Sequence, residues 1–251
     1  MNANQWLHYF KTNSSKRNKI PWERGVNLPP RARRALGRSW QRFQVGESGD
    51  GRHIRKAASR VGEPDYEEAI DLFVKEEQGH ADLFACALKL MNIPLLRFHW
   101  SDFAFVTLRR MLGLRHELLV LLLPEMIAKR YFRALRDGLD DEVVKAICDQ
   151  VCHDEEGHVA FHVETLRFMF GATPVWQKGI LVAMWKLLYR ISCLVVIWDH
   201  RGVLRESGVQ AGQFYWDCMM IFDETAASIF NSAVPMRQHA WLMSARRGGA
   251  S

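Results

Sequence analysis

The chain has 251 residues, of which 48% are hydrophobic and 25% are charged, and this balance excludes a disordered or fibrous protein. Its five cysteines are odd in number and show no paired Cys-x-x-Cys spacing, which excludes a disulfide framework and a cysteine-rich zinc module. The formal net charge is +6, and the first 60 residues carry 14 Lys and Arg against three Asp and Glu.

Residues 1–30 are predicted to form a basic N-terminal arm, broken by prolines and carrying scattered aromatic residues. Such an arm can bind an anionic membrane, nucleic acid, or an acidic face of its own domain or of a second subunit. Because no aromatic-interleaved RNA-binding signature accompanies it, we do not expect nucleic acid as a partner. The chain opens without the pattern of a signal peptide, so we expect a cytoplasmic protein, with peripheral membrane contact left open.

Two helices, over residues 31–60 and 65–91, are predicted to form a first hairpin. Pro30 suits the start of the first helix, because the first turn does not need its missing N–H. Three glycines between residues 46 and 51 weaken this helix. We nevertheless expect the helix to continue, with Glu47 buried on the same face as the preceding apolar residues. The alternative is a loop in which Glu47 is exposed.

Residues 92–101 are predicted to cross to a second hairpin, whose helices cover residues 102–138 and 140–170. Pro124 lies immediately before Glu125 in the first of these helices. Because proline removes a backbone hydrogen bond, we expect a local bend at this point.

Two further helices, over residues 175–205 and 210–230, are predicted to pack on the bundle. The first is strongly apolar but contains Lys186 and Arg190. Central charges are costly in a bilayer, so we expect a buried fifth helix rather than a membrane span.

The chain contains two copies of the pattern Glu-x-x-His, as Glu77-x-x-His80 and Glu155-x-x-His158. A glutamate and a histidine three apart lie on one face of a helix and can bind one metal ion together. Each copy has a single glutamate 30 residues upstream, and both midpoints fall at a predicted turn. Each hairpin therefore places a glutamate opposite a Glu-x-x-His pair. The resulting candidate metal ligands are Glu47, Glu77, His80, Glu125, Glu155 and His158.

His162 lies one helical turn beyond His158 on the same predicted face. It could be a further metal ligand, a hydrogen-bond donor to a ligating carboxylate, or a core histidine bonded to a neighbour. The sequence leaves these three alternatives open.

This ligand set resembles that of the ferritin-like superfamily of dinuclear carboxylate proteins, over about residues 31–170. The resemblance implies an all-α fold, a four-helix bundle of two hairpins joined by a crossover, followed by two C-terminal helices. It also implies that Glu77 and Glu155 bridge two metal ions. The other ligands would complete the two ends, Glu47 with His80 and Glu125 with His158. The expected segments are a basic arm (1–30), the bundle (31–171), the additional helices (172–235) and a flexible tail (236–251).

The resemblance further implies two iron ions, with manganese or a mixed iron–manganese pair as alternatives. It predicts a di-iron oxidase or oxygenase that uses O2 and an electron donor to oxidise an unknown small-molecule substrate. A ferroxidase or other iron-handling protein is the second hypothesis, and a metal-free helical binding module is the third. The apolar helix over residues 175–205 favours a covered substrate pocket over an iron-storage shell. A homodimer is compatible with all three hypotheses.

Overall fold

The computed structural model describes residues 1–100, 107 and 114–231, and every regular element in these ranges is helical. The predicted start of the third helix and the predicted tail lie outside these ranges. In chain order, the elements are α1 (Ala3–Ser15), the short 3-10 helix η1 (Trp22–Arg24), α2 (Pro30–Glu47), α3 (Arg52–Ser59), α4 (Pro64–Leu90), α6 (Leu114–Gly138), α7 (Glu142–Phe170), α8 (Val175–Glu206) and α9 (Ala211–Phe230).

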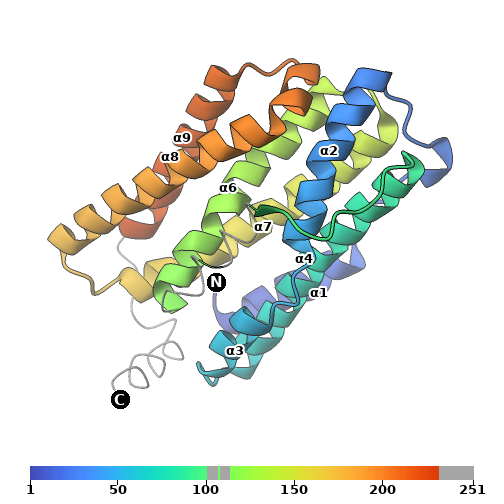
Figure 1. Cartoon of the computed structure of the whole chain (residues 1–251). Helices are drawn as coiled ribbons and strands as arrows, with labels where there is room; N and C mark the ends of the chain where they lie inside the picture. The colour runs from blue at the N-terminus through green and yellow to red at the C-terminus, as the bar shows by residue number, and fades with distance from the viewer. Residues whose placement is uncertain (101–106, 108–113, 232–251) are drawn as a thin grey trace.

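Four long helices, α2, α4, α6 and α7, form the predicted bundle (Figure 1). Helix α2 packs against α4, and α6 packs against α7, so the two hairpins form as the turn signals predict. Contacts between α4 and α7 join the hairpins. Leu36, Phe84, Phe132 and Ile147, one from each helix, have no exposed surface. The predicted all-α ferritin-like bundle is therefore confirmed.

The single helix predicted over residues 31–60 is wrong, because the structure has two helices there. Helix α2 ends at Glu47, and α3 begins after a turn in which Gly51 has a φ of +63°. This backbone conformation favours glycine, and a Cβ there would also lie 2.5 Å from the Val74 side chain. The glycines therefore end the helix at Glu47, whose side chain remains partly buried.

Within the predicted N-terminal arm, residues Ala3–Ser15 form helix α1, which packs against α4. Phe10 is fully buried, and its ring contacts that of Phe73 on α4 with centroids 6.5 Å apart. Beyond α1, Arg17 pairs with the buried Asp154 of α7 at 2.6 Å. Part of the basic charge near the N-terminus thus forms an ion pair with an acidic group of the same domain.

Helices α8 and α9 pack on the outside of the bundle, α8 against α2 and α6, and α9 against α6 and α7 (Figure 1). The expectation that α8 is buried is wrong for one of its faces. In its most apolar window of 18 residues, 17% of the residues are buried. By length and composition alone, α8 is also a helix that could cross a membrane.

Gly138, at the end of α6, lies against the backbone at the end of α8. A Cβ at this position would be 2.0 Å from the carbonyl oxygen of Ser207, which cannot move aside as a flexible side chain can. We expect Gly138→Ala to lower the free energy of unfolding by about 1–3 kcal/mol in urea denaturation. Gly179→Ala, with no atom within 4 Å of the new Cβ, is the control and should be neutral or slightly stabilising. Equal stability of the two variants would contradict this packing.

Candidate metal centre

Five of the six predicted ligands form two overlapping groups between α2, α4 and α7. One group consists of Glu47, Glu77 and His80, and the other of Glu77, Glu155 and His158. Within each group, one ligand atom from every residue lies within 4.8 Å of the others. Glu77 belongs to both groups, as a bridging ligand would. The mirrored spacing in the sequence therefore does bring these side chains together.

The sixth predicted ligand, Glu125, lies beside this cluster but outside both groups. Its Oε1 is 3.1 Å from Nε2 of His162, and its negative charge acts on Glu155. Both Glu125 and His162 are buried. Pro124 is accommodated inside α6, which continues past it. The contact places His162 next to Glu125, outside both groups, in an arrangement that agrees with each of the three roles predicted for it.

Several buried atoms of the centre lack a hydrogen-bond partner among the described residues. Nδ1 of His158 is only 2.9 Å from Oε1 of Glu77, yet the two do not meet in hydrogen-bonding geometry. Unpaired burial of polar atoms is costly, and such groups in folded proteins usually have a partner. A bound metal ion would supply that partner, so the donor set fits one. The atoms concerned are Glu77 Oε1, His80 Nδ1, Glu125 Oε2, Glu155 Oε2, His158 Nδ1, and both ring nitrogens of His162.

The two histidines are each held by a carboxylate from the opposite helix. Nε2 of His80 on α4 is 2.9 Å from Asp154 on α7, and Nε2 of His158 on α7 is 3.0 Å from Glu76 on α4. A carboxylate only accepts hydrogen bonds, so each Nε2 carries the proton and donates it. With the Nε2 proton held in this way, Nδ1 of each ring is the nitrogen that would bind a metal ion, which would take the place of any Nδ1 proton.

The sequence motifs did not predict these two supporting carboxylates, although a signal was present. Glu76 immediately precedes Glu77, and Asp154 immediately precedes Glu155, so both motifs begin with two consecutive acidic residues. Adjacent residues on one helix point about 100° apart, so the first acid faces the partner helix when the second faces the metal site. The repeated acidic pair could have predicted the cross-helix contacts.

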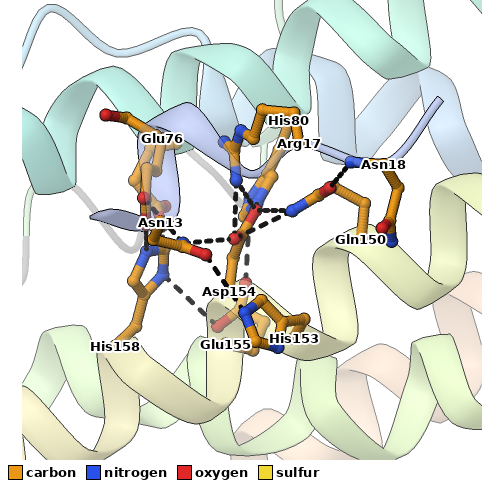
Figure 2. A network of polar contacts seen from close by, with 12 residues as sticks. Asn13, Arg17, Asn18, Glu76, His80, Gln150, His153, Asp154, Glu155 and His158 are labelled. Atoms are coloured by element: carbon orange, nitrogen blue, oxygen red, sulfur yellow. Dashed lines mark hydrogen bonds and ion pairs between the residues drawn. The ribbon is translucent and has the colours of Figure 1, made fainter. Parts of the chain in front are cut away.

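Helix α1 joins the two supporting carboxylates into one network (Figure 2). The amide of Asn13 donates to Glu76 and to Asp154, both at 2.8 Å. Arg17 donates to both oxygens of Asp154 at 2.6 Å, and Gln150 donates to the same carboxylate. Burial disfavours ionisation of Asp154, but the contacts with His80, then Arg17 and Asn13, outweigh it and lower the pKa of Asp154 well below its ordinary value.

A glycine in the second motif allows α1 to approach this closely. A Cβ on Gly157 would lie 2.2 Å from the hydroxyl oxygen of Tyr9. The corresponding Gly79 of the first motif is less crowded, because a Cβ added there would meet only the Arg17 side chain, at 3.5 Å. The glycine of Glu155-x-x-His158 thus serves the packing of α1 over the centre, a role that its motif position did not reveal.

The ionisable side chains of the centre shift one another's pKa values in opposite directions. Burial and the nearby charge of Glu77 raise the pKa of Glu47, and raise that of Glu155 well above its ordinary value. Burial disfavours ionisation of Glu77 as well, but the contact with His158 outweighs it and lowers the Glu77 pKa to about 2. Burial also disfavours the charged imidazole of His158, but Glu76 and Glu77 raise its pKa well above the ordinary value. A bound cation would relieve the repulsion among these carboxylates.

Aromatic side chains close one side of the centre, and the other side is more open. The ring of Phe73 meets those of His158 and His162 edge-on, with centroids 4.7 and 5.1 Å apart. By contrast, the side chain of Glu77 is 22% exposed, and Glu47 is also only partly buried. The side of the centre that is exposed to solvent is therefore the one at the end of α2.

Comparison with known proteins locates the fold. No protein-family model and no curated protein matches the sequence. The structure is similar to that of a Synechococcus protein described as protein 19 with aldehyde deformylating oxidase activity, with a TM-score of 0.60 and 21% sequence identity. The match covers 86% of this chain and 97% of that one. At this identity the similarity establishes the fold alone, that of an all-helical bundle.

Removing a supporting carboxylate should weaken metal binding without removing any ligand. Asp154→Ala frees the Nε2 proton of His80, and we expect an affinity loss of about 10–100-fold for Fe(II) or Mn(II) in anaerobic titration. Glu76→Ala should do the same through His158. Glu156→Ala is the control, since this exposed neighbour forms an ion pair with Arg133 and holds neither histidine. Equal affinities of all three variants and the parent protein would rule out the supporting role.

Proposed function

We propose that this protein is an oxidoreductase with a carboxylate-bridged dinuclear centre, which activates O2 to oxidise an organic substrate. The observation that carries the proposal is the set of buried, unpaired ligand atoms shared by two Glu-x-x-His helices. A metal-free binding module would have no use for such atoms and would bear the cost of burying them. The proposed ligands are the six residues that the sequence motifs predict, with His162 as a further ligand or as support for Glu125.

The donor set favours iron or manganese, and we propose iron. Carboxylate oxygens outnumber imidazole nitrogens, which suits Fe(II) or Mn(II) better than zinc or copper. Held by these residues, a pair of reduced irons would supply the redox chemistry for O2 activation, with electrons replaced by an external donor. The protein itself would orient the ligands through Asp154 and Glu76, and would exclude water with Phe73 and helix α1.

Structural similarity bears on the choice between an oxidase and an iron-storage protein. The Synechococcus protein is described as having an oxidase activity, and this chain matches 97% of its length. We therefore favour the oxidase. An aldehyde is the first substrate class to test, because the activity described for the Synechococcus protein acts on an aldehyde.

Anaerobic loading with Fe(II), followed by admission of O2, tests the dinuclear centre. We expect two irons per chain and a new near-ultraviolet charge-transfer band. Glu77→Ala and Glu155→Ala should each reduce the stoichiometry below one, because both metal ions would lose a shared ligand. Failure of the folded parent protein to bind iron would sink the proposal.

Substrate turnover separates the remaining alternatives. The loaded protein, supplied with a chemical reductant and O2, should consume an aldehyde and release its formyl carbon, measured as formate. Uptake of many irons per chain without oxidation of any organic compound would favour an iron-handling protein instead. Retention of two irons by His162→Ala would assign that residue to support of Glu125 rather than to the ligand set.

A further inference from the structure

Helix α8 exposes a continuous apolar stripe on its outer face. The spacing of its members alternates between four and three residues, so they line one side of the helix. Each is between 51 and 66% exposed, which is unusual for large apolar side chains placed next to one another. The stripe consists of Ile180, Met184, Leu187, Ile191, Leu194 and Trp198. One turn before it, Trp176 is 67% exposed on the same side.

The opposite face of α8 is fixed to the bundle. Trp185, Tyr189 and Cys193 are buried there, and the indole N–H of Trp185 donates to the carbonyl oxygen of Leu119 at 2.8 Å. Packed on the bundle in this way, α8 presents the stripe side-on, along its length, although its length and composition would also allow a membrane span.

The charges within the stripe's segment of α8 have one sign. Residues 175–198 contain no Asp or Glu, and Arg190 is exposed beside the stripe. Two more exposed arginines, Arg201 and Arg205, continue the helix beyond Trp198. Lys186 of the same segment is paired with Asp223 of α9 at 2.6 Å, and the exposed Glu206 follows Arg205, so the cationic charge at the edge of the stripe comes from Arg190 and Arg201.

Helix α2 adds to this charge. It packs against α8, and a Cβ added to Gly202 on α8 would lie 3.5 Å from Ala35 on α2. Figure 1 shows the two helices as neighbours at one end of the bundle. The exposed arginines of α2 are Arg31, Arg34 and Arg38.

We propose that α8 binds the surface of an anionic lipid bilayer, lying in its plane with the stripe at the boundary of headgroups and acyl chains. An exposed apolar face with cationic edges is the pattern of an interfacial helix. Trp176 and Trp198 at the two ends of the stripe suit the same boundary, where indole rings are favoured. The proposal concerns where the protein acts and does not depend on the metal centre.

A second copy of the chain is the competing occupant, and the charges disfavour it. Two stripes paired antiparallel about their midpoints would bring both Arg190 side chains together. Residues 175–198 contain no acid, and Asp223 of α9, which reaches this segment, is already paired with Lys186 at 2.6 Å. A bilayer containing anionic lipid attracts the same arginines. The lipid surface is thus the occupant that the observations favour.

Sedimentation of the full-length protein with lipid vesicles tests the proposal. We expect binding to vesicles of phosphatidylcholine and phosphatidylglycerol at low salt, and weaker binding to phosphatidylcholine alone. Leu187→Glu should lower the affinity about 10-fold or more, because it places a charge in the middle of the stripe where it meets the lipid. Ile180→Glu, at a separate exposed position, should have a similar effect.

Ala160→Glu is the matched control, since it adds the same charge at an exposed position of α7. Circular dichroism and Fe(II) stoichiometry should be unchanged in all three variants, which separates this proposal from that of the metal centre. No binding to anionic vesicles, or equal losses in the stripe variants and the control, would overturn it. So would a stable dimer, seen by light scattering, that Leu187→Glu dissociates, because the stripe would then belong to a second copy.

Discussion

The structure depends on a reciprocal contact between α4 and α7, in which each helix supplies the carboxylate that holds the other's histidine. His80 donates to Asp154 and His158 donates to Glu76, at nearly equal distances. These are charge-assisted contacts in a buried setting, where a lost partner is more costly than at the surface. They fix the relative height of the two helices. They also leave the remaining nitrogen of each ring directed at the cluster of glutamates.

The cluster of glutamates is unfavourable by itself and needs hydrogen-bond donors around it. Glu155 is buried next to the partly exposed Glu77, and desolvation and their mutual repulsion would favour protonation or separation. Helix α1 and the residues just after it contribute to the support, because Asn13 and Arg17 donate hydrogen bonds to the supporting carboxylates. The N-terminal segment, which has the composition of a mobile basic arm, therefore helps to hold the supporting carboxylates of the centre in place.

Large apolar side chains occur both in the core of the bundle and on the exposed face of α8. Inside the bundle, residues such as Phe84 and Phe132 stack and exclude water. On α8, apolar side chains on one face serve packing, while those on the other remain exposed. Hydrophobic burial alone would not leave such a stripe in solvent, because covering it would stabilise the protein. A contact outside the chain is the simplest explanation.

The sequence by itself determined the bundle and most of the centre. The equal distances from Glu47 to Glu77 and from Glu125 to Glu155, each centred on a turn, predicted both helix pairings. The continuous helix assumed before the first turn was wrong, because α2 ends at Glu47 and α3 follows it. Tertiary structure decided what local spacing could not encode. The end of α2 at Glu47 depends on Gly51 meeting Val74, and the position of Glu125 beside His162 depends on how the hairpins pack. The exposure of α8 was likewise undetermined, because an apolar helix has the same composition whether the bundle covers both of its faces or only one.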